Sequence, residues 1–328
     1  FIKFMSPFNK YQKLFLEFLE LNLPDNSPKN LYDPTRYILN MGGKRIRPLF
    51  TLITVDIFNG DVKDALPAAL AIEIFHNFSL VHDDIMDNAP IRRGKDTVHK
   101  KWNLNTAILS GDVMLIWSYE ILQQYPPEIS GILTKLFSQT ARKVCEGQQL
   151  DIDFPQKTQV SLEDYMQMIK YKTAVLIGCS MSVGAIISNA SSEKIIEINS
   201  IGTDIGLIFQ LQDDYLDVFG TVNKIGKQIG GDIIENKKTF LHIYVLENGS
   251  ENELKDFKYW LGLSPKDPSN KIIEITNIYN SSGAKKAIIN KIKILTKSVY
   301  DKIESLKLDN SKKKLIVSFF EKIKNRDF

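Results

Sequence analysis

The sequence predicts an all-α fold, and two patterns support that prediction. Apolar residues recur at spacings of three and four along almost the whole chain, which places them on one face of a helix. Strict alternation of apolar and polar residues over five or more positions, the pattern of a half-buried strand, is hard to find. Clusters rich in Gly, Pro and Asn mark where one helix ends and the next begins. We therefore expect nearly every element to be a helix.

The first five expected helices are bounded by recognisable breaks. Lys10–Leu21 stops before LPDNSP, and Pro34–Met41 stops at a pair of glycines. Arg47–Phe58 follows the loop segment GGKR, and Leu66–Asp87 is a long apolar run that ends in HDDIMD. Thr106–Gln124 stops at YPPE, because paired prolines do not continue a helix.

Four further helices and a series of shorter ones account for the rest of the chain. Ile129–Leu150 stops before FPQK, and only two residues separate Leu162–Lys170 from Thr173–Ser188. Glu193–Phe219 stops at the glycine-containing loop GTVNKIGKQIGG. Shorter helices then run to Ile323.

The chain shows no sign of a domain boundary. No low-complexity linker and no repeat of fixed period divides its 328 residues, and with 43% hydrophobic side chains it can bury a large core. We expect a single domain over residues 1–328. The lysine-rich tail after Lys285 has apolar residues at helical spacing, so we expect a solvated amphipathic face rather than a partner-binding surface.

Composition indicates a soluble globular protein. The formal net charge of +3 is small for this length, so we expect no nucleic-acid partner, and any basic site must be local. The longest uncharged segment, Thr173 to Ala190, is rich in Gly, Ser and Ala, which predicts a buried helix and no transmembrane segment. The N-terminal stretch lacks the features of a secretion signal. Cys145 and Cys179 do not suggest a disulfide framework; we expect both to be buried, in a cytoplasmic protein.

The stretch HDDIMD closes an apolar run with three carboxylates. On a helix Asp83 and Asp87 share a face, with Asp84 one position around. Two unit charges about 6 Å apart repel by roughly 3 kcal/mol at an effective dielectric of about 20, so carboxylates beside an apolar face need a cation. Oxygen ligands alone suit a hard ion such as Mg²⁺, which binds through one or two carboxylates plus a substrate phosphate. A single copy of the motif would more often be a solvated helix end.

A second copy occurs in FQLQDDYLD, again at the end of an apolar helix. Asp213 and Asp217 share a face there, and Gln210 lies one turn before Asp213. Chance is a poor explanation for two such motifs at two such helix ends. The pair predicts a two-sided magnesium clamp, with the helices facing each other across a cavity.

Magnesium held by carboxylates implies phosphate, and phosphate implies basic residues. Four short segments supply them beside glycine turns or the acidic motifs. They are GGKRIRP with Lys44, Arg45 and Arg47, PIRRGK with Arg92 and Arg93, KYKT with Lys172 and Thr173, and GKQIGGDIIENKKT with Lys227 and Lys237. Each lysine alone is more often an ordinary surface residue, but their concentration favours phosphate binding, and paired arginines suit bidentate phosphate oxygens.

His76 lies seven residues before Asp83, two helical turns along the same face and about 10 Å away. No second histidine stands at ligand spacing, so we expect no metal role for it. Two interpretations remain: a hydrogen-bond donor to an anion, which we favour, or a core histidine with a satisfied partner.

Together these ordered motifs resemble the trans-prenyltransferases, the polyprenyl (isoprenyl) diphosphate synthases. The resemblance covers essentially the whole chain and runs through GGKRIRP, DDIMD with RRG, GDVMLI, EGQQLDI, YKT, FQLQDD, GKQIGGDIIENKKT and NRDF. It implies an all-helical bundle around a deep central cavity, the isoprenoid synthase fold, usually as a homodimer. It also implies a magnesium-dependent, head-to-tail condensation of isopentenyl diphosphate with an allylic diphosphate.

The resemblance implies a role for each residue that matches a motif. The magnesium ligands would be Asp83, Asp87 and Asp213. The allylic diphosphate would be bound by Arg92, Lys172, Lys227 and Lys237, with Thr173 and Gln210 nearby. Isopentenyl diphosphate would be bound by Lys44, Arg47, His76 and Arg93. Support, directly or through water, would come from Asp84, Asp214, Asp217, Gln148 and Asp151. The catalytic set would be Asp83, Asp87, Asp213, Arg92, Lys172 and Lys227.

The chemistry of ionisation agrees with these assignments. Breaking the carbon–oxygen bond puts negative charge on the leaving diphosphate, which magnesium and basic side chains stabilise as it forms. The allylic cation would react with water, so the second substrate must be adjacent and water excluded. No general base on the protein is required; in this family the departed diphosphate is thought to take the proton.

The helix face before Asp83 bears on product length. Phe75, Phe78 and Ser79 stand eight, five and four residues before the motif. In the family, bulky side chains four and five residues before it stop the product at farnesyl length, whereas small ones allow a longer chain. The mixed pattern here favours geranylgeranyl over farnesyl diphosphate. Ordinary core packing is the alternative interpretation for each position.

Three rival functions remain. A class I terpene cyclase shares the fold and a first aspartate motif, but its second metal site is typically built around Asn, Ser and Glu. A non-catalytic modulatory subunit of a heteromeric synthase tends to lose an aspartate motif or basic residues, and both are intact here. A helical phosphate or nucleotide hydrolase would need a positioned nucleophile, and no P-loop signature is present.

Overall fold

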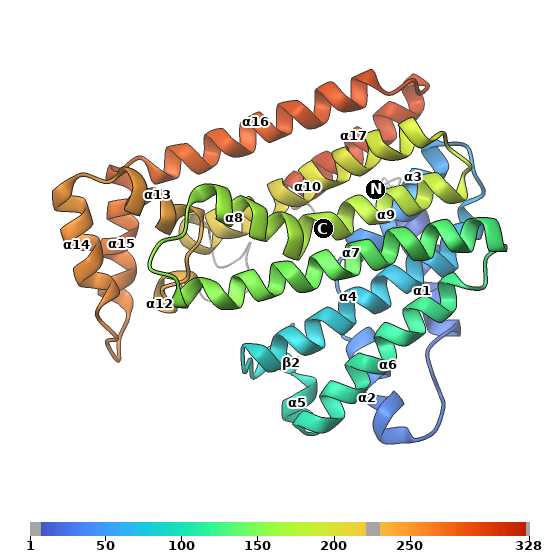
Figure 1. The fold of residues 1–328 in the computed structure, drawn as a ribbon, viewed down its shortest axis with the longest axis horizontal. Coiled ribbons are helices and arrows are strands. Elements are labelled where there is room, and N and C mark those ends of the chain that lie inside the picture. Colours follow the sequence, from blue (N-terminus) through green and yellow to red (C-terminus); the bar gives the residue numbers. More distant parts are fainter. Residues whose placement is uncertain (1–7, 221–229, 326–328) are drawn as a thin grey trace, which may run out of the picture. The chain divides into compact units, whose positions relative to one another are not determined.

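The computed structural model describes residues 8–220 and 230–325, and the all-α prediction is confirmed (Figure 1). The first half of the described chain contains α1 (Asn9–Leu21), α2 (Lys29–Leu39), α3 (Ile46–Ile57), a 3₁₀ turn (Val62–Ala65), α4 (Leu66–Met86), strands β1 (Ile91–Arg92) and β2 (Lys95–Asp96), α5 (Val98–Lys101), α6 (Leu104–Leu122) and α7 (Pro127–Asp153). The second half contains a 3₁₀ turn (Phe154–Gln156), α8 (Leu162–Ile169), a π-helical turn (Lys170–Ala174), α9 (Val175–Ile187), α10 (Ser192–Phe219), α12 (Gly231–Ile234), α13 (Phe240–Asn248), α14 (Glu251–Leu261), α15 (Ser269–Ser281), α16 (Ala284–Ser305) and α17 (Asn310–Asn325).

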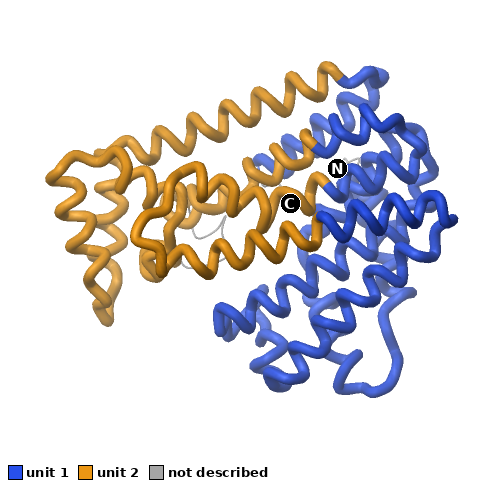
Figure 2. The backbone as a smooth tube through the Cα atoms, viewed as in Figure 1, with its two compact units in different colours: residues 1–139, 179–199, 306–328 blue, residues 140–178, 200–305 orange. Residues whose placement is uncertain are grey.

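The chain divides into two compact units (Figure 2). Unit 1 comprises residues 1–139, 179–199 and 306–328, and unit 2 comprises residues 140–178 and 200–305. Because the divisions fall inside α7, α9 and α10, neither unit is one continuous stretch of chain. The expectation of a single domain over residues 1–328 stays a prediction.

Helix α4 is the central element of unit 1. Pro67 lies in its first turn, where a missing N–H costs no intrahelical hydrogen bond. Every residue from Ala68 to Phe75 is buried, as expected for a helix that is apolar on all sides. It packs most extensively against α6 and also contacts α3. Consequently its C-terminal end, with the first aspartate motif, is set by a rigid core.

Helix α13 has the equivalent place in unit 2. Its residues Phe240, Leu241, Ile243 and Val245 are buried in one hydrophobic cluster. The helix contacts α8, α14, α15 and α16. The turn that precedes α13 carries the end of the GKQIGGDIIENKKT segment, so this core fixes that turn.

The expected helices agree with the observed ones apart from their ends. The largest difference is at α2, which begins at Lys29 and not at Pro34. The expected helix began at Pro34, but the observed helix accommodates this proline in its second turn, after Pro28 at the N-cap. The two residues expected to separate Leu162–Lys170 from Thr173–Ser188 lie in the π-helical turn, so the chain does not leave the helix there.

Two short elements were not expected from the sequence. Strands β1 and β2 pair antiparallel, with Ile91 opposite Asp96 and Arg92 opposite Lys95. Arg93 and Gly94 between them both have positive φ, as a two-residue hairpin requires. The usual signal for this turn is Asn-Gly or Asp-Gly, which is why RRGK was not recognised as a hairpin.

The burial of two further features was predicted with mixed success. Cys179 is buried as expected, but Cys145 is exposed, so that expectation was wrong. Cys145 lies on α7, whose apolar pattern is weak enough to leave a small residue on the solvent side. Among the described residues, one stretch, Val62–Met86, is long and apolar enough to cross a membrane; 72% of its most apolar window is buried, as in a core helix.

A charged cluster around Asp56 joins three helices of unit 1. The Asp56 carboxylate, at the end of α3, accepts hydrogen bonds from the Tyr11 hydroxyl of α1 and from Lys10 at 3.2 Å. Lys312 of α17 binds the same carboxylate at 2.6 Å and the Asp56 carbonyl at 2.5 Å. Burial opposes the charged form, but Lys312, Tyr11 and Lys10 together lower the pKa of Asp56 to about 2.

We expect Asp56→Asn to lower the free energy of unfolding by about 1–2 kcal/mol after allowance for solvent screening. Because the folded-state pKa is depressed, the stabilisation is complete above the unfolded pKa of about 3.9 and is lost only as the pH falls toward 2. Urea denaturation of parent and variant should therefore give a constant difference between pH 5 and pH 8. A difference that disappears within this range would contradict the assignment.

Candidate active site

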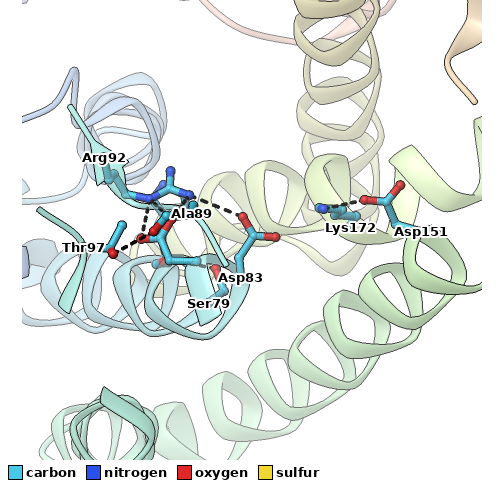
Figure 3. Close-up of polar contacts among 9 residues, drawn as sticks. Ser79, Asp83, Ala89, Arg92, Thr97, Asp151 and Lys172 are labelled. Atoms are coloured by element: carbon cyan, nitrogen blue, oxygen red, sulfur yellow. Dashed lines mark hydrogen bonds and ion pairs between the residues drawn. The ribbon is translucent and has the colours of Figure 1, made fainter. Parts of the chain in front are cut away.

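The first aspartate motif is organised by Arg92. The Arg92 Nε donates to both carboxylate oxygens of Asp84, at 2.9 and 2.8 Å, and Nη2 lies 3.4 Å from an oxygen of Asp83 (Figure 3). Asp84 is 1% exposed, and burial raises its pKa although Arg92 opposes this. Asp83 is partly exposed, and Asp87, one turn later, is exposed. Asp84 is thus the internal anchor of this motif.

Arg92 is placed by the short hairpin. Thr97 closes its base: the Thr97 hydroxyl donates to the Ala89 carbonyl at 2.8 Å, and its N–H donates to the Pro90 carbonyl at 3.1 Å (Figure 3). The next residue, Arg93, donates from Nη1 to the Gly42 carbonyl. A Cβ on Gly43 would lie 2.9 Å from the Arg93 guanidinium, so the glycine admits that side chain. The hairpin therefore joins the GGKRIRP loop to the first aspartate motif.

The arginines of the GGKRIRP loop have different environments. Arg45 is buried and binds the Glu73 carboxylate and the Leu39 carbonyl, so its basic group is committed to the fold. Arg47 lies with its Nη1 3.1 Å from His76 Nε2, and burial lowers the pKa of Arg47 to about 10. Arg45 was grouped with the phosphate-binding basics in the sequence; its buried pair with Glu73 makes that grouping wrong.

Unit 1 brings together the residues predicted for isopentenyl diphosphate. Burial, followed by the positive charges of Arg47, Arg93 and Arg92, holds the pKa of His76 well below its usual range. His76 is therefore neutral at pH 7, and the positive charges of three arginines act on it. Lys44 is exposed in the same loop. A neutral imidazole can donate one hydrogen bond without adding to the positive charge.

The second aspartate motif has its own buried anchor in unit 2. The Asp214 carboxylate accepts hydrogen bonds from the Tyr165 hydroxyl, from the Phe240 N–H at 3.3 Å and from the Gln210 amide at 3.3 Å. Burial raises the pKa of Asp214 to about 6, although all three donors lower it. Tyr165 was not singled out from the sequence, because nothing in a sequence links it to a carboxylate 49 positions away.

The π-helical turn supplies the basic side of the same region. Lys172 Nζ lies 2.7 Å from the Asp151 carboxylate of α7 (Figure 3). The Thr173 hydroxyl donates to Gln210 Oε1 of α10 at 3.2 Å. A small pocket of about 40 Å³ lies here in unit 2; its lining residues are Asp151, Tyr165, Met168, Ile169, Lys172, Thr173, Gln210, Asp214, Lys237, Lys238 and Thr239. Cations and hydrogen-bond donors around one pocket are what phosphate binding needs.

The segment before α13 adds further polar groups. Asp217 accepts the Asp232 N–H at 3.0 Å, and the Lys237 N–H donates to the Asp232 carbonyl. Burial, together with Asp214 and Asp217, raises the pKa of Asp232 to about 7, although Lys237 opposes this. Lys238 is engaged elsewhere, with the carbonyls of Phe154 and Lys157.

Three other predicted positions are less informative. Asp213 is half-buried on α10, and Gln148 is half-buried on α7. Lys227 lies outside the described residues, as does most of the NRDF segment.

The donor set of each motif suits magnesium, although neither motif forms an all-protein cage among the described residues. Among residues 8–220 and 230–325, no three or more His, Cys, Asp or Glu side chains are arranged to hold a metal by themselves. Mg²⁺ does not require such a cage, since it binds through one or two carboxylates plus phosphate oxygens and water. Asp83 and Asp87 offer hard oxygens one turn apart, and the mutual effects of Asp214, Asp217 and Asp232 show a concentration of negative charge that a cation would relieve.

The predicted chain-length residues lie in an aromatic cluster of unit 1. The Phe75 ring centroid lies 5.5 Å from that of Phe78 and 5.1 Å from that of Phe137 on α7. Phe78 also contacts His82, at 4.8 Å between ring centroids. Ser79 is half-buried, and its hydroxyl donates to the His76 carbonyl at 2.8 Å. Phe75 and Phe78 are thus packed core residues, and Ser79 is a small, half-buried residue that follows them on the same helix.

The buried pair of Arg45 and Glu73 was not predicted, although the sequence contains a signal for it. Glu73 is the only acidic residue of α4 before its terminal motif. A charge inside a buried helix requires a partner, and Arg45 supplies it. The sequence could have indicated that need, but not which arginine meets it.

Comparison with known proteins identifies close relatives. Residues 28–279 match the family model described as Polyprenyl synthetase. The geranylgeranyl pyrophosphate synthase of Geoglobus acetivorans is 42% identical over 246 residues, 74% of this chain and 76% of that protein. The farnesyl diphosphate synthase of Micrococcus luteus is 38% identical over 241 residues, 69% of this chain and 82% of that protein. A crystal structure of a geranylgeranyl pyrophosphate synthase matches with a TM-score of 0.94 at 42% identity, over 98% of this chain and 99% of that one.

The neutral state of His76 gives a pH-dependent prediction. In the unfolded chain His76 binds a proton with a pKa of about 6.5, whereas in the folded chain its pKa lies well below that value. Lowering the pH from 7.5 to 5 therefore lowers the free energy of unfolding, by at most about 1.4 kcal/mol per pH unit from this residue. We expect His76→Gln to lose less stability than the parent over this range in urea denaturation. Parallel pH profiles would show that His76 titrates in the folded chain as it does in the unfolded one.

Proposed function

We infer the function of this chain from one premise: it belongs to the polyprenyl synthetase family. It is a prenyltransferase, and a short-chain prenyl diphosphate synthase. We propose that it joins isopentenyl diphosphate head to tail to an allylic diphosphate. The observation that carries this proposal is that each aspartate motif has at least one basic side chain near it within its own unit: Arg92 beside the first, and Lys172 and Lys237 beside the second.

The allylic diphosphate is proposed to bind Arg92, Lys172, Lys227 and Lys237. The Nη1 group of Arg92 has no hydrogen-bond partner within residues 8–220 and 230–325, so it can take a phosphate oxygen while Nε and Nη2 hold Asp84. Lys172 is held by Asp151, and Thr173 adds a hydroxyl beside it. These groups would stabilise charge as it develops on the leaving diphosphate, because they are already oriented.

We propose magnesium as the cofactor, held by Asp83, Asp87 and Asp213. When bound, it would supply positive charge to the departing diphosphate. Asp84 and Asp214, being committed to internal hydrogen bonds, would keep the motifs in place rather than bind the ion. Gln148, Asp151 and Asp217 would support these groups directly or through water.

Isopentenyl diphosphate is proposed to bind Lys44, Arg47, His76 and Arg93. The 3.1 Å contact between Arg47 and His76 supports this, because it presents a guanidinium and a neutral donor together. Holding the second substrate beside the allylic cation excludes water and makes the condensation effectively unimolecular.

We propose that the enzyme acts as a homodimer in the cytoplasm. Helix α6 supports a second copy as partner, since Ile108, Leu109 and Ile116 are exposed on it. Exposed apolar side chains clustered on one helix are typical of a surface that another subunit covers.

Geranylgeranyl diphosphate is the product we favour over farnesyl diphosphate. The support is the small Ser79 beside the packed rings of Phe75 and Phe78. Relatives of similar identity do not decide between the two, because the Geoglobus acetivorans protein is named for the geranylgeranyl product and the Micrococcus luteus protein for the farnesyl product.

The proposed reaction is tested with purified protein, magnesium and isopentenyl diphosphate, offered in turn with dimethylallyl, geranyl and farnesyl diphosphate. We expect elongation, with C20 as the main product by chromatography. Asp83→Asn should lower the rate by at least about 100-fold, because it removes transition-state charge stabilisation. The matched control is Asp256→Asn, an exposed carboxylate on α14, which should leave the rate unchanged. No elongation with any primer would favour a modulatory subunit, and a cyclic hydrocarbon would favour a cyclase.

Product length is tested with Ser79→Phe. A third ring beside Phe75 and Phe78 should shorten the main product from C20 to C15 or less. Ser79→Ala is the control, because it removes the hydroxyl without adding bulk and should keep the parent's product. Identical products from all three proteins would remove this helix face from chain-length control.

A further inference from the structure

Two glycines in unit 2 make unusually close approaches to the π-helical turn Lys170–Ala174. A Cβ on Gly147 of α7 would lie 2.2 Å from the Lys172 amide nitrogen and 2.7 Å from the Lys172 Cα. A Cβ on Gly206 of α10 would lie 2.5 Å from the Ala174 Cα. In both cases the nearest atom belongs to the backbone, which cannot rotate away. The two helices therefore hold the turn from two directions at contact distance.

Each of these helices also binds the side chain that the turn presents. Four residues after Gly147, Asp151 holds the Lys172 ammonium at 2.7 Å. Four residues after Gly206, Gln210 accepts the Thr173 hydroxyl at 3.2 Å. Residues four apart lie on the same helix face. On each helix, therefore, the glycine contacts the backbone of the turn, and the residue one turn later on the same face binds a side chain of the turn. This repeated arrangement is more than chance crowding of small residues.

Both glycines stand in helix interiors, where glycine is the poorest helix former apart from proline. Gly131, on the same α7, shows the contrast, because a Cβ there would meet no atom within 4 Å. A π-helical turn inside a helical segment often marks a functional site, since the extra residue re-aims the side chains around it.

We propose that Gly147 and Gly206 are positioning residues that fix Lys172 and Thr173 for the allylic diphosphate. This proposal rests on the proposed function, because it assigns the glycines to the site that holds the leaving group. An added methyl group at either position displaces the turn and moves both side chains away from the pocket that they line with Gln210 and Lys237. Neither glycine touches substrate in this scheme; each acts through the turn.

The test compares Gly147→Ala and Gly206→Ala with the parent. We expect the KM for the allylic diphosphate and the Kd for inorganic diphosphate with magnesium to rise at least about tenfold, because small misplacements of binding groups are costly. The KM for isopentenyl diphosphate, assigned to residues of unit 1, should stay within about twofold of the parent value. A parallel rise in both KM values would overturn the proposal.

Two control variants separate positioning from packing. Gly131→Ala should leave both KM values unchanged. Gly184→Ala, on α9, is as crowded as the test positions, with its Cβ 2.5 Å from the Thr51 carbonyl, but lies in unit 1. It should lower thermal stability without the selective rise for the allylic diphosphate. The same selective rise in this variant would overturn the proposal.

A double-mutant cycle tests whether Gly147 acts through Lys172. In a Lys172→Ala background, Gly147→Ala should raise the Kd for inorganic diphosphate by clearly less than it does in the parent, because one of the two groups that it positions is gone. Fully additive effects would contradict the proposal. Failure of both glycine variants to fold would also contradict it, because the glycines would then be required for folding alone. A parent that makes no prenyl product would overturn the proposed function, while diphosphate binding would still test the glycines. A parent that binds no inorganic diphosphate would overturn this proposal itself.

Discussion

A carboxylate at the end of an apolar helix must find a cation or several donors inside the fold, and both aspartate motifs are built around that constraint. Asp84 is satisfied by the Arg92 guanidinium, and Asp214 by Tyr165, Gln210 and the Phe240 N–H. Removing one partner of a buried pair leaves an uncompensated charge, which costs about 3–5 kcal/mol. The hairpin that carries Arg92 and the core that carries Phe240 are thereby tied to the motifs whose carboxylates they satisfy.

The same constraint explains how one short motif divides its tasks. In DDxxD the first and fifth residues share a helix face, and the second lies about 100° around. In both copies the second aspartate is buried: Asp84 is 1% exposed and Asp214 4%. The other carboxylates remain more accessible. One residue of each motif therefore anchors the helix end, and the remaining two carboxylates are more accessible to a ligand.

Helical periodicity predicted most of the fold, and the acidic motifs at helix ends predicted most of the candidate-site residues. The ends of α3, α4 and α10 were predicted within one or two residues, because apolar spacing and breakers act locally. Arg45 was misjudged for a different reason. It stands between Lys44 and Arg47 in a basic loop, and only its left-handed backbone, with φ of 50°, and its contact with Glu73, 28 residues away, take it into the core. Tertiary packing determines which residue becomes such a partner, and the local sequence does not indicate it.

The irregular elements are also where the proposed ligand-binding cations stand. Regular helices place side chains at fixed intervals of about 100°, so a helix cannot aim two neighbouring residues at one ligand without distortion. The chain distorts the backbone at three such places: the positive-φ turn at Arg93, the left-handed Arg45 that precedes Arg47, and the π-helical turn at Lys172 and Thr173. Each distortion has a close contact elsewhere in its own unit: Arg93 with Gly43, Arg45 with Glu73 of α4, and the π-helical turn with Gly147 of α7. The unusual backbone is therefore fixed before any ligand arrives, which is what preorganised electrostatic stabilisation requires.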